Sequence, residues 1–161
     1  MRKEQAIFAC GCFWGAQYQF ERVKGVLRST VGYIGGEKEN PSYQEVKAHT
    51  TGHAEATQVE FDPKQVSYTD LCKVFFEIHD PAQTDGQGPD IGPQYRSEIF
   101  YLNENQKQEA EAVIDILRQK GYEVNTRLTP ATTFWEAEDY HQHYYEKTGG
   151  EPYCHIRIKK F

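Results

Sequence analysis

The sequence has one methionine, four cysteines and no excess of positive charge among its 161 residues. The formal net charge is −6, so the chain lacks the electrostatic attraction that general binding to nucleic acid or to an anionic membrane requires. No hydrophobic run is long enough to cross a bilayer. The apolar segment near the N-terminus begins at Ala6 and stops at Gly11, too short for a signal peptide. We therefore expect a cytoplasmic protein without a nucleic-acid or membrane partner.

The composition is that of a folded protein, with 38% hydrophobic and 26% charged residues. The chain shows no internal repeat, low-complexity tract or linker, and its length suits one domain over residues 1–161. Four cysteines in a cytoplasmic protein favour catalytic or redox use over a disulfide framework.

Strands and helices are predicted to alternate along the chain. Apolar segments, alternation and capping signals predict strands over 5–10, 26–34, 53–61, 96–102 and, more weakly, 122–128, helices over 68–78 and 103–120, and a helix or turn over 136–147. The connection over 80–94 is rich in proline and glycine and long enough to suggest a functional loop. Few strands, some of them amphipathic, indicate a two-layer α+β fold.

The motif at residues 11–15, GCFWG, places a cysteine between two glycines and before two aromatic residues. It follows a predicted buried strand and precedes a segment with helical spacing, so Cys12 is expected at a helix N-terminus. Amides and the dipole there favour the thiolate, which is the nucleophilic form. Flanking glycines permit a tight turn and leave the sulfur approachable. A reactive thiol beside two rings suggests chemistry on a small apolar group.

This motif resembles the signature of the A-class peptide methionine sulfoxide reductases. Three further segments resemble blocks of that family, in the same order and at compatible spacing: residues 51–56 (TGHAEA), 90–97 (DIGPQYRS) and 137–142 (AEDYHQ). The similarity extends from about residue 7 to 155. It implies a mixed sheet with a ferredoxin-like core and helices packed against it, followed by a long irregular C-terminal segment.

The resemblance also implies the site residues for reduction of methionine S-sulfoxide, free and in proteins. Cys12 would attack the sulfoxide sulfur, and a protonated Glu55 would donate to its oxygen, since a partly apolar pocket raises a carboxyl pKa. The remaining positions that match are the oxygen-binding tyrosines, the rings that hold the substrate methyl, and an aspartate that orders the site: Tyr43, Tyr95, Phe13, Trp14 and Asp90. His53 shares the predicted strand face with Glu55 and is expected near the substrate.

The second thiol is assigned to Cys154, which resembles the family's resolving cysteine. It would condense with the sulfenic acid on Cys12 to a disulfide that thioredoxin reduces, with no other cofactor and no metal. Cys10 lies two residues before Cys12 and could approach the site, but it is read as a packing residue, as is Cys72. The protein is expected to be a monomer.

Three alternatives remain open from the residues alone. Cys10, Cys12, His141, His143, Cys154 and His155 offer metal ligands, although C-x-C and H-x-H are unusual spacings for zinc. A cysteine hydrolase would need a histidine base near Cys12, for which His53 is the obvious candidate. The aromatic and acidic segment 134–145 could instead belong to a peptide-binding module without catalysis.

Overall fold

A computed structural model describes residues 3–150, 152 and 155–161. The elements, in chain order, are β1 (Glu4–Cys10), α1 (Phe13–Glu21), β2 (Val26–Ile34), α2 (Tyr43–Lys47), β3 (Ala54–Phe61), α3 (Tyr68–Glu77), β4 (Gly86–Gln87), β5 (Asp90–Ile91), the 3₁₀ turn η1 (Pro93–Tyr95), β6 (Ser97–Tyr101), α4 (Glu104–Gln119), β7 (Arg127–Pro130), β8 (Trp135–Glu136), the 3₁₀ turn η2 (Asp139–His141) and α5 (Tyr144–Thr148).

The main sheet has the strand order β7-β6-β1-β3-β2-β8. Its central strands β6, β1, β3 and β2 pair antiparallel with one another, while the edge strand β7 runs parallel to β6. With α1 after β1 and α3 after β3, this is the βαββαβ order of a ferredoxin-like core. The predicted α+β class with a mixed sheet is confirmed. None of the helices in the described part of the chain is long and apolar enough to cross a membrane.

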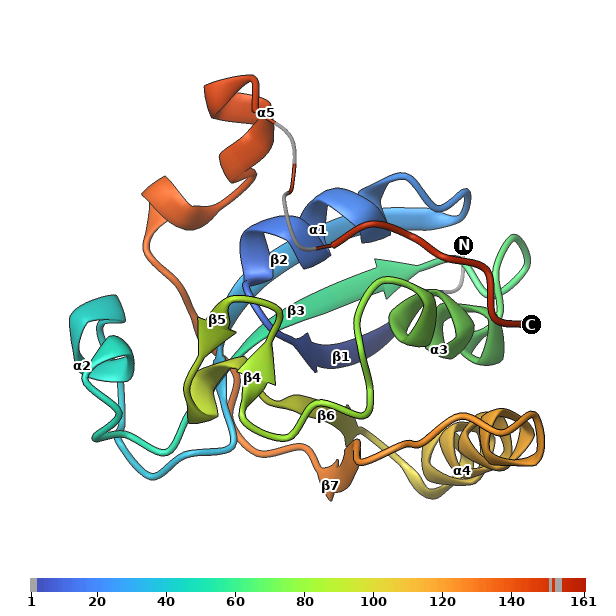
Figure 1. Cartoon of the computed structure of the whole chain (residues 1–161). Helices are drawn as coiled ribbons and strands as arrows, with labels where there is room; N and C mark the ends of the chain where they lie inside the picture. Colours follow the sequence, from blue (N-terminus) through green and yellow to red (C-terminus); the bar gives the residue numbers. More distant parts are fainter. Residues whose placement is uncertain (1–2, 151, 153–154) are drawn as a thin grey trace.

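The main core lies between the sheet and helices α1, α3 and α4, which cover the same face (Figure 1). Phe8 on β1 stacks between Phe20 of α1 at 5.1 Å and Phe75 of α3 at 5.3 Å, measured between ring centroids. All three rings are fully buried. Because a buried aromatic contributes about 3–5 kcal/mol relative to alanine, this stack fixes α1 and α3 firmly against the strand that leads to Cys12.

Local capping explains where the two long helices begin. Ser67 is the N-cap residue of α3, as predicted for the helix over 68–78, and it forms a complete capping box with Asp70, which was not predicted. At α4, Asn103 accepts a hydrogen bond from the Gln106 amide, but the Gln106 side chain accepts from the amide of Leu102 instead of that of Asn103. The predicted helix start is therefore correct, while the return hydrogen bond is shifted by one residue.

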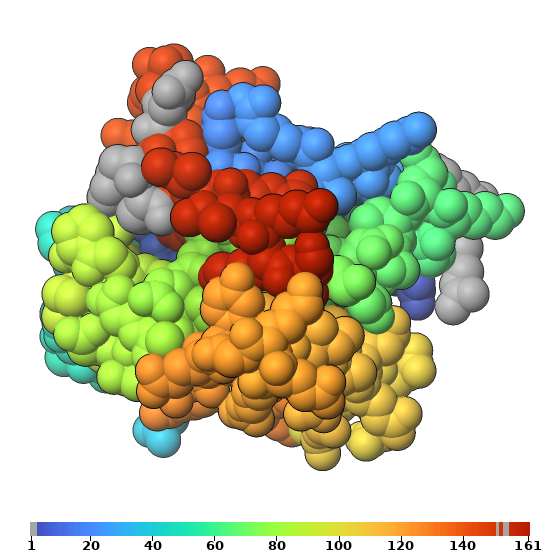
Figure 2. All heavy atoms as spheres, turned by 45° about the vertical axis from the view of Figure 1, so that its right-hand side comes forward, coloured from blue at the N-terminus to red at the C-terminus, as the bar shows by residue number. Residues whose placement is uncertain are grey.

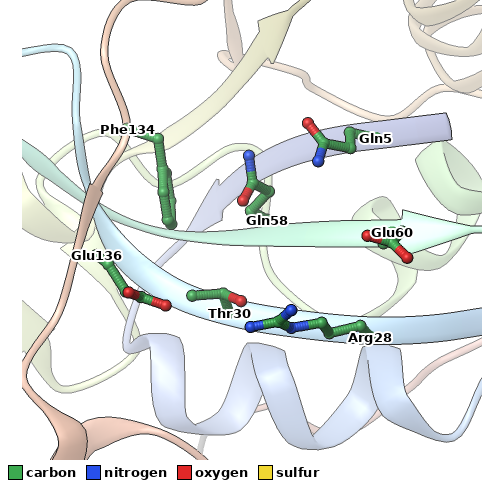
Figure 3. Close-up of a pocket in the computed structure, with 7 residues that line it drawn as sticks. All are labelled: Gln5, Arg28, Thr30, Gln58, Glu60, Phe134 and Glu136. Carbon is green, nitrogen blue, oxygen red and sulfur yellow. The ribbon is translucent and has the colours of Figure 1, made fainter.

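The opposite face of the sheet has a small apolar cluster near β6 and a polar region beside it. Arg28 on β2 lies opposite Glu60 on β3, which lies opposite Gln5 on β1. Figure 3 shows the shallow pocket over these strands, which is lined by Gln5, Arg28, Thr30, Gln58, Glu60, Phe134 and Glu136. A half-exposed sheet face accounts for the polar alternation in these strands.

Two predicted elements are wrong. The strand expected over 122–128 is found instead at Arg127–Pro130, because the Asn125 amide donates to the carbonyl of Pro81 in a loop rather than to a neighbouring strand. The segment 136–147 is not one helix or turn: it divides into η2 and α5, separated by His143 with φ +54°. The short helix α2, which Ser42 begins with a capping box, was not predicted.

Candidate active site

Cys12 lies at the junction of β1 and α1, where it is the N-cap residue of the helix. Its side chain is 8% exposed, so the thiol is close to the surface but mostly enclosed. The preceding Gly11 adopts φ +100°, and a Cβ there would lie 2.8 Å from the Cβ of Gln87. Only glycine satisfies both conditions. The predicted strand-to-helix placement of the cysteine is confirmed, and the helix start favours its thiolate form.

Glu55 projects from β3 toward the start of α1. Its Oε1 accepts a hydrogen bond from the backbone amide of Phe13 at 3.3 Å, one residue after the thiol. Burial raises the pKa of Glu55 to about 8, the Phe13 amide opposes the rise, and the negative charge of Asp90 adds to it. At neutral pH this carboxyl group is therefore largely protonated and can donate a proton.

A small pocket of about 230 Å³ joins these two groups. It is lined by Cys12, Phe13, Trp14, Tyr43, Lys47, Glu55, Asp90 and Tyr95. Seven of these eight residues are among the predicted site residues, and they come from α1, α2, β3, β5 and η1. Only Lys47, on the last turn of α2, was not predicted. Segments far apart in the sequence therefore converge on one thiol and one carboxyl group.

The two tyrosines of the pocket keep their phenolic protons. Burial, followed by the nearby Glu55 carboxyl group, raises the pKa of Tyr43 to about 12. The same causes raise the pKa of Tyr95. Both hydroxyl groups are therefore hydrogen-bond donors at neutral pH, which is what an oxygen atom gaining negative charge needs.

Asp90 enters the pocket from the β4–β5 hairpin, where it pairs with Gln87. Its charge raises the pKa of Glu55, Tyr43 and Tyr95. One half-buried carboxylate thus helps to keep three potential proton donors in their protonated forms.

His53 does not line the pocket. Its Nδ1 accepts a hydrogen bond from the Gly36 amide at 3.0 Å, and its Nε2 donates to the carbonyl of Lys38 at 2.6 Å. The ring therefore fixes the loop after β2 and is not placed to act as a base for Cys12. The predicted resolving residue, Cys154, lies outside the described residues.

Sequence reasoning considered His141 only as a possible metal ligand, whereas its ring lies at the centre of an aromatic wall that also includes Phe13, Trp14 and Tyr43. The ring is fully buried, lies 4.4 Å from the Tyr43 ring and 5.2 Å from the Phe13 ring, and its Nδ1 accepts a hydrogen bond from Trp14 Nε1 at 2.9 Å. Burial lowers the pKa of His141, so the ring is neutral and can accept from the indole. Trp14 also stacks on Tyr144 at 3.7 Å. The motif at 137–142 was the available signal.

Glu138 is a second residue without a predicted role. Its two carboxylate oxygens accept from the Tyr33 hydroxyl at 2.9 Å and from the Tyr43 amide at 3.0 Å. Burial opposes ionisation, but these hydrogen bonds outweigh it and lower the pKa of Glu138. The ionised group thereby ties the beginning of α2, and with it Tyr43, to the C-terminal segment.

This geometry gives little support to the alternatives of a metal site, a cysteine hydrolase or a peptide-binding module. Cys10 is buried in the main core, as is Cys72. Within the described part of the chain, the one trio of side chains close enough to share a metal ion is Glu21, His143 and Glu146, which does not include either cysteine of the C-x-C motif. Two residues of the aromatic segment 134–145, His141 and Tyr144, pack against Trp14, which lines the Cys12 pocket.

The pocket combines a thiol at a helix start with a buried, protonated carboxyl group, two phenol donors and an aromatic wall. This combination is typical of an enzyme that uses a thiol as its nucleophile. A family profile described as peptide methionine sulfoxide reductase matches residues 4–161. The chain belongs to this family and is an oxidoreductase.

The similarity to individual proteins agrees with this assignment. The peptide methionine sulfoxide reductase MsrA of Geobacter sulfurreducens is 49% identical over 150 residues, which cover 91% of this chain and 93% of the relative. The reduced form of Mxr1 from Saccharomyces cerevisiae superimposes with a TM-score of 0.92 at 32% identity, covering 99% of this chain and 93% of that one. Mxr1 in complex with Trx2 shares the fold, with a TM-score of 0.67 at 24% identity, covering 99% of this chain and 91% of that one.

Proposed function

We propose that the chain reduces the S epimer of methionine sulfoxide, free and in proteins, with Cys12 as nucleophile and Glu55 as acid. The observation that carries this proposal is the placement of a protonated, buried carboxyl group on the amide next to the thiol. Attack of a thiolate on a sulfoxide sulfur needs a proton donor for the oxygen, and few other reactions need a carboxylic acid rather than a base beside a cysteine.

The first step forms methionine and a sulfenic acid. The Cys12 thiolate attacks the sulfoxide sulfur, while Glu55 gives its proton to the oxygen and Tyr43 and Tyr95 donate hydrogen bonds to it. The oxygen passes to Cys12 as a hydroxyl group, and the substrate leaves as a thioether. Cys12 is thereby oxidised by two electrons, and the sulfoxide is reduced by two. Phe13 and Trp14, which belong to the aromatic wall, would contact and hold the substrate methyl group.

The second half of the cycle restores the thiol. The Cys154 thiol would attack the sulfenic sulfur, releasing water and forming a Cys12–Cys154 disulfide, which thioredoxin would reduce by exchange. The family assignment and the solved complex of Mxr1 with Trx2 support this partner. We expect one catalytic domain over 1–161, a monomer in the cytoplasm, and no metal or prosthetic group.

The decisive experiment measures dithiothreitol-dependent reduction of the two separated epimers of N-acetyl-methionine sulfoxide, with Cys12→Ser as the control. We expect turnover of the S epimer alone and none in the variant. Turnover of the R epimer, or activity that survives Cys12→Ser, would contradict the assigned stereochemistry or nucleophile.

A further inference from the structure

The last residues of the chain follow a fixed path over the body of the protein, shown in dark red in Figure 2. His155 is fully buried, and its Nε2 donates to the carbonyl of Cys10 at 2.6 Å. Farther along, the amide of Ile158 donates to the carbonyl of Glu77 at 2.8 Å, and the amide of Lys160 donates to the Glu77 carboxylate at 3.0 Å. This segment, residues 155–161, is called the tail below.

The tail exposes two isoleucine side chains while its backbone is held. Ile156 is 66% exposed and Ile158 is 63% exposed, the two highest values for large hydrophobic side chains among the described residues. They border a groove of about 500 Å³, whose other walls come from residues 77–83, 87–88 and 122–123. The apolar part of these walls includes Pro81 and the half-exposed Tyr122. Contiguous apolar surface of this kind marks an interaction site.

We propose that this tail groove receives the protein dithiol that reduces the Cys12–Cys154 disulfide, an inference that rests on the proposed function. Cys154 precedes Ile156 by two residues, so the two lie within about 7 Å along the chain. A typical partner covers about 800 Å² per side, a patch with a radius of about 16 Å. Any protein whose thiolate reaches the Cys154 sulfur therefore also covers the residues that follow it.

The charged residues of the tail also restrict which surface chemistry of the partner protein fits the groove. Arg157 and Lys159 are exposed beside the two isoleucines, although the whole chain has a net charge of −6. Arg157 also holds Glu77 at 3.0 Å, which fixes the basic rim in place. The fitting partner thus presents an apolar surface around its dithiol, with carboxylates facing the tail and not facing Asp80 and Glu123, which line the other walls of the groove.

Atoms and electrons balance in the thiol–disulfide exchange between the partner and the enzyme. One thiolate of the partner attacks the Cys154 sulfur, the Cys12–Cys154 bond breaks, and Cys12 leaves as a thiolate. The second thiol of the partner then attacks the mixed disulfide and releases Cys154. Two electrons and two protons pass from the partner to the enzyme, and the groove only has to hold the partner in line with the sulfur.

The test compares two reductants for the same enzyme. In the double variant Ile156→Ser/Ile158→Ser, we expect the KM for thioredoxin to rise about tenfold, because two apolar anchors are lost from the interface. Turnover driven by dithiothreitol should stay unchanged, since a small dithiol needs no groove. Leu102→Ser is the matched control: Leu102 is 43% exposed just before α4, at the opposite end of that helix from Lys120, which contacts the tail.

Each outcome decides the question. An unchanged KM for thioredoxin, with turnover intact, overturns the proposal, as does a wild-type protein that accepts dithiothreitol but not thioredoxin. A wild-type dimer that the double variant dissociates, again with unchanged KM, makes the groove a contact between copies. If the double variant unfolds, the single variant Ile158→Asp should raise the KM more than Leu102→Asp does. If the wild type shows no turnover driven by dithiothreitol, the proposed function is contradicted, and this result is distinct from a failure of the docking proposal.

Discussion

Replacing Glu55 by glutamine tests proton donation by this carboxyl group while its hydrogen bond to the Phe13 amide is kept. Glutamine has nearly the same shape, and its Oε1 can still accept from the Phe13 amide, as the carboxyl oxygen does at 3.3 Å. What the variant loses is the proton that Glu55 carries and the charge that it acquires at high pH. We therefore expect Glu55→Gln to fold and to bind substrate but to lose most of its turnover, by about 10²–10⁴-fold for a missing general acid.

The same substitution should change how stability depends on pH. The pKa of Glu55 is raised from 4.5 to about 8 in the folded protein. Between these values the unfolded chain loses the proton and the folded chain keeps it, so the free energy of unfolding falls as pH rises. At 1.36 kcal/mol per unit, the wild type loses about 5 kcal/mol over this interval, and about 3 kcal/mol of that is lost by pH 7. The neutral glutamine loses none of it.

Urea unfolding at pH 5, 6, 7 and 8 would measure the effect. The difference in unfolding free energy between Glu55→Gln and the wild type should grow with pH, in favour of the variant, and level off above pH 8. Wild-type turnover should fall over the same high-pH range as Glu55 ionises. Parallel stability curves for the two proteins would refute the argument, because they would mean that Glu55 titrates alike in the folded and unfolded states.

Three further substitutions test other parts of the site. Cys154→Ser should permit one turnover but block thioredoxin-driven recycling, so undiminished steady-state rates would contradict its resolving role. His141→Phe removes the acceptor for Trp14 Nε1 and should lower kcat/KM about tenfold while shifting tryptophan fluorescence, whereas unchanged kinetics would show that the indole is held otherwise. Gly15→Ala would place a Cβ 2.5 Å from His155 Nδ1 and should lower the free energy of unfolding by about 1–3 kcal/mol, as chemical denaturation would show; equal stability would mean that the ring moves aside easily.

Local signals in the sequence were sufficient for most of the sheet and the longer helices. The strand Val26–Ile34 has the predicted bounds, and α3 begins where Ser67 predicts it, because alternation and capping are properties of neighbouring residues. Cys12 was placed correctly for the same reason. The strand β7 was displaced because its pairing depends on β6, which lies well upstream in the chain.

The parts of the site that sequence reasoning missed depend on distant contacts. Trp14 and His141 are 127 residues apart, and Cys10 and His155 are 145 residues apart. No periodicity or spacing links such pairs, and a histidine in a polar segment gives no sign that it will be buried under a tryptophan. The resemblance to a family identified Glu55, Tyr43 and Tyr95 among many similar residues, which composition alone could not do.

The contact between His155 and the backbone of Cys10 has a consequence for biosynthesis. The first strand is made early, but the His155 ring that packs against Gly11 and Gly15 follows Cys10 by 145 residues in the chain. A ribosome-bound chain therefore carries a nucleophilic cysteine before the surface around it is complete. The surface around the thiol is complete only after His155 has been made and has folded back onto β1, so a truncation that removes this residue acts on the catalytic end of the molecule.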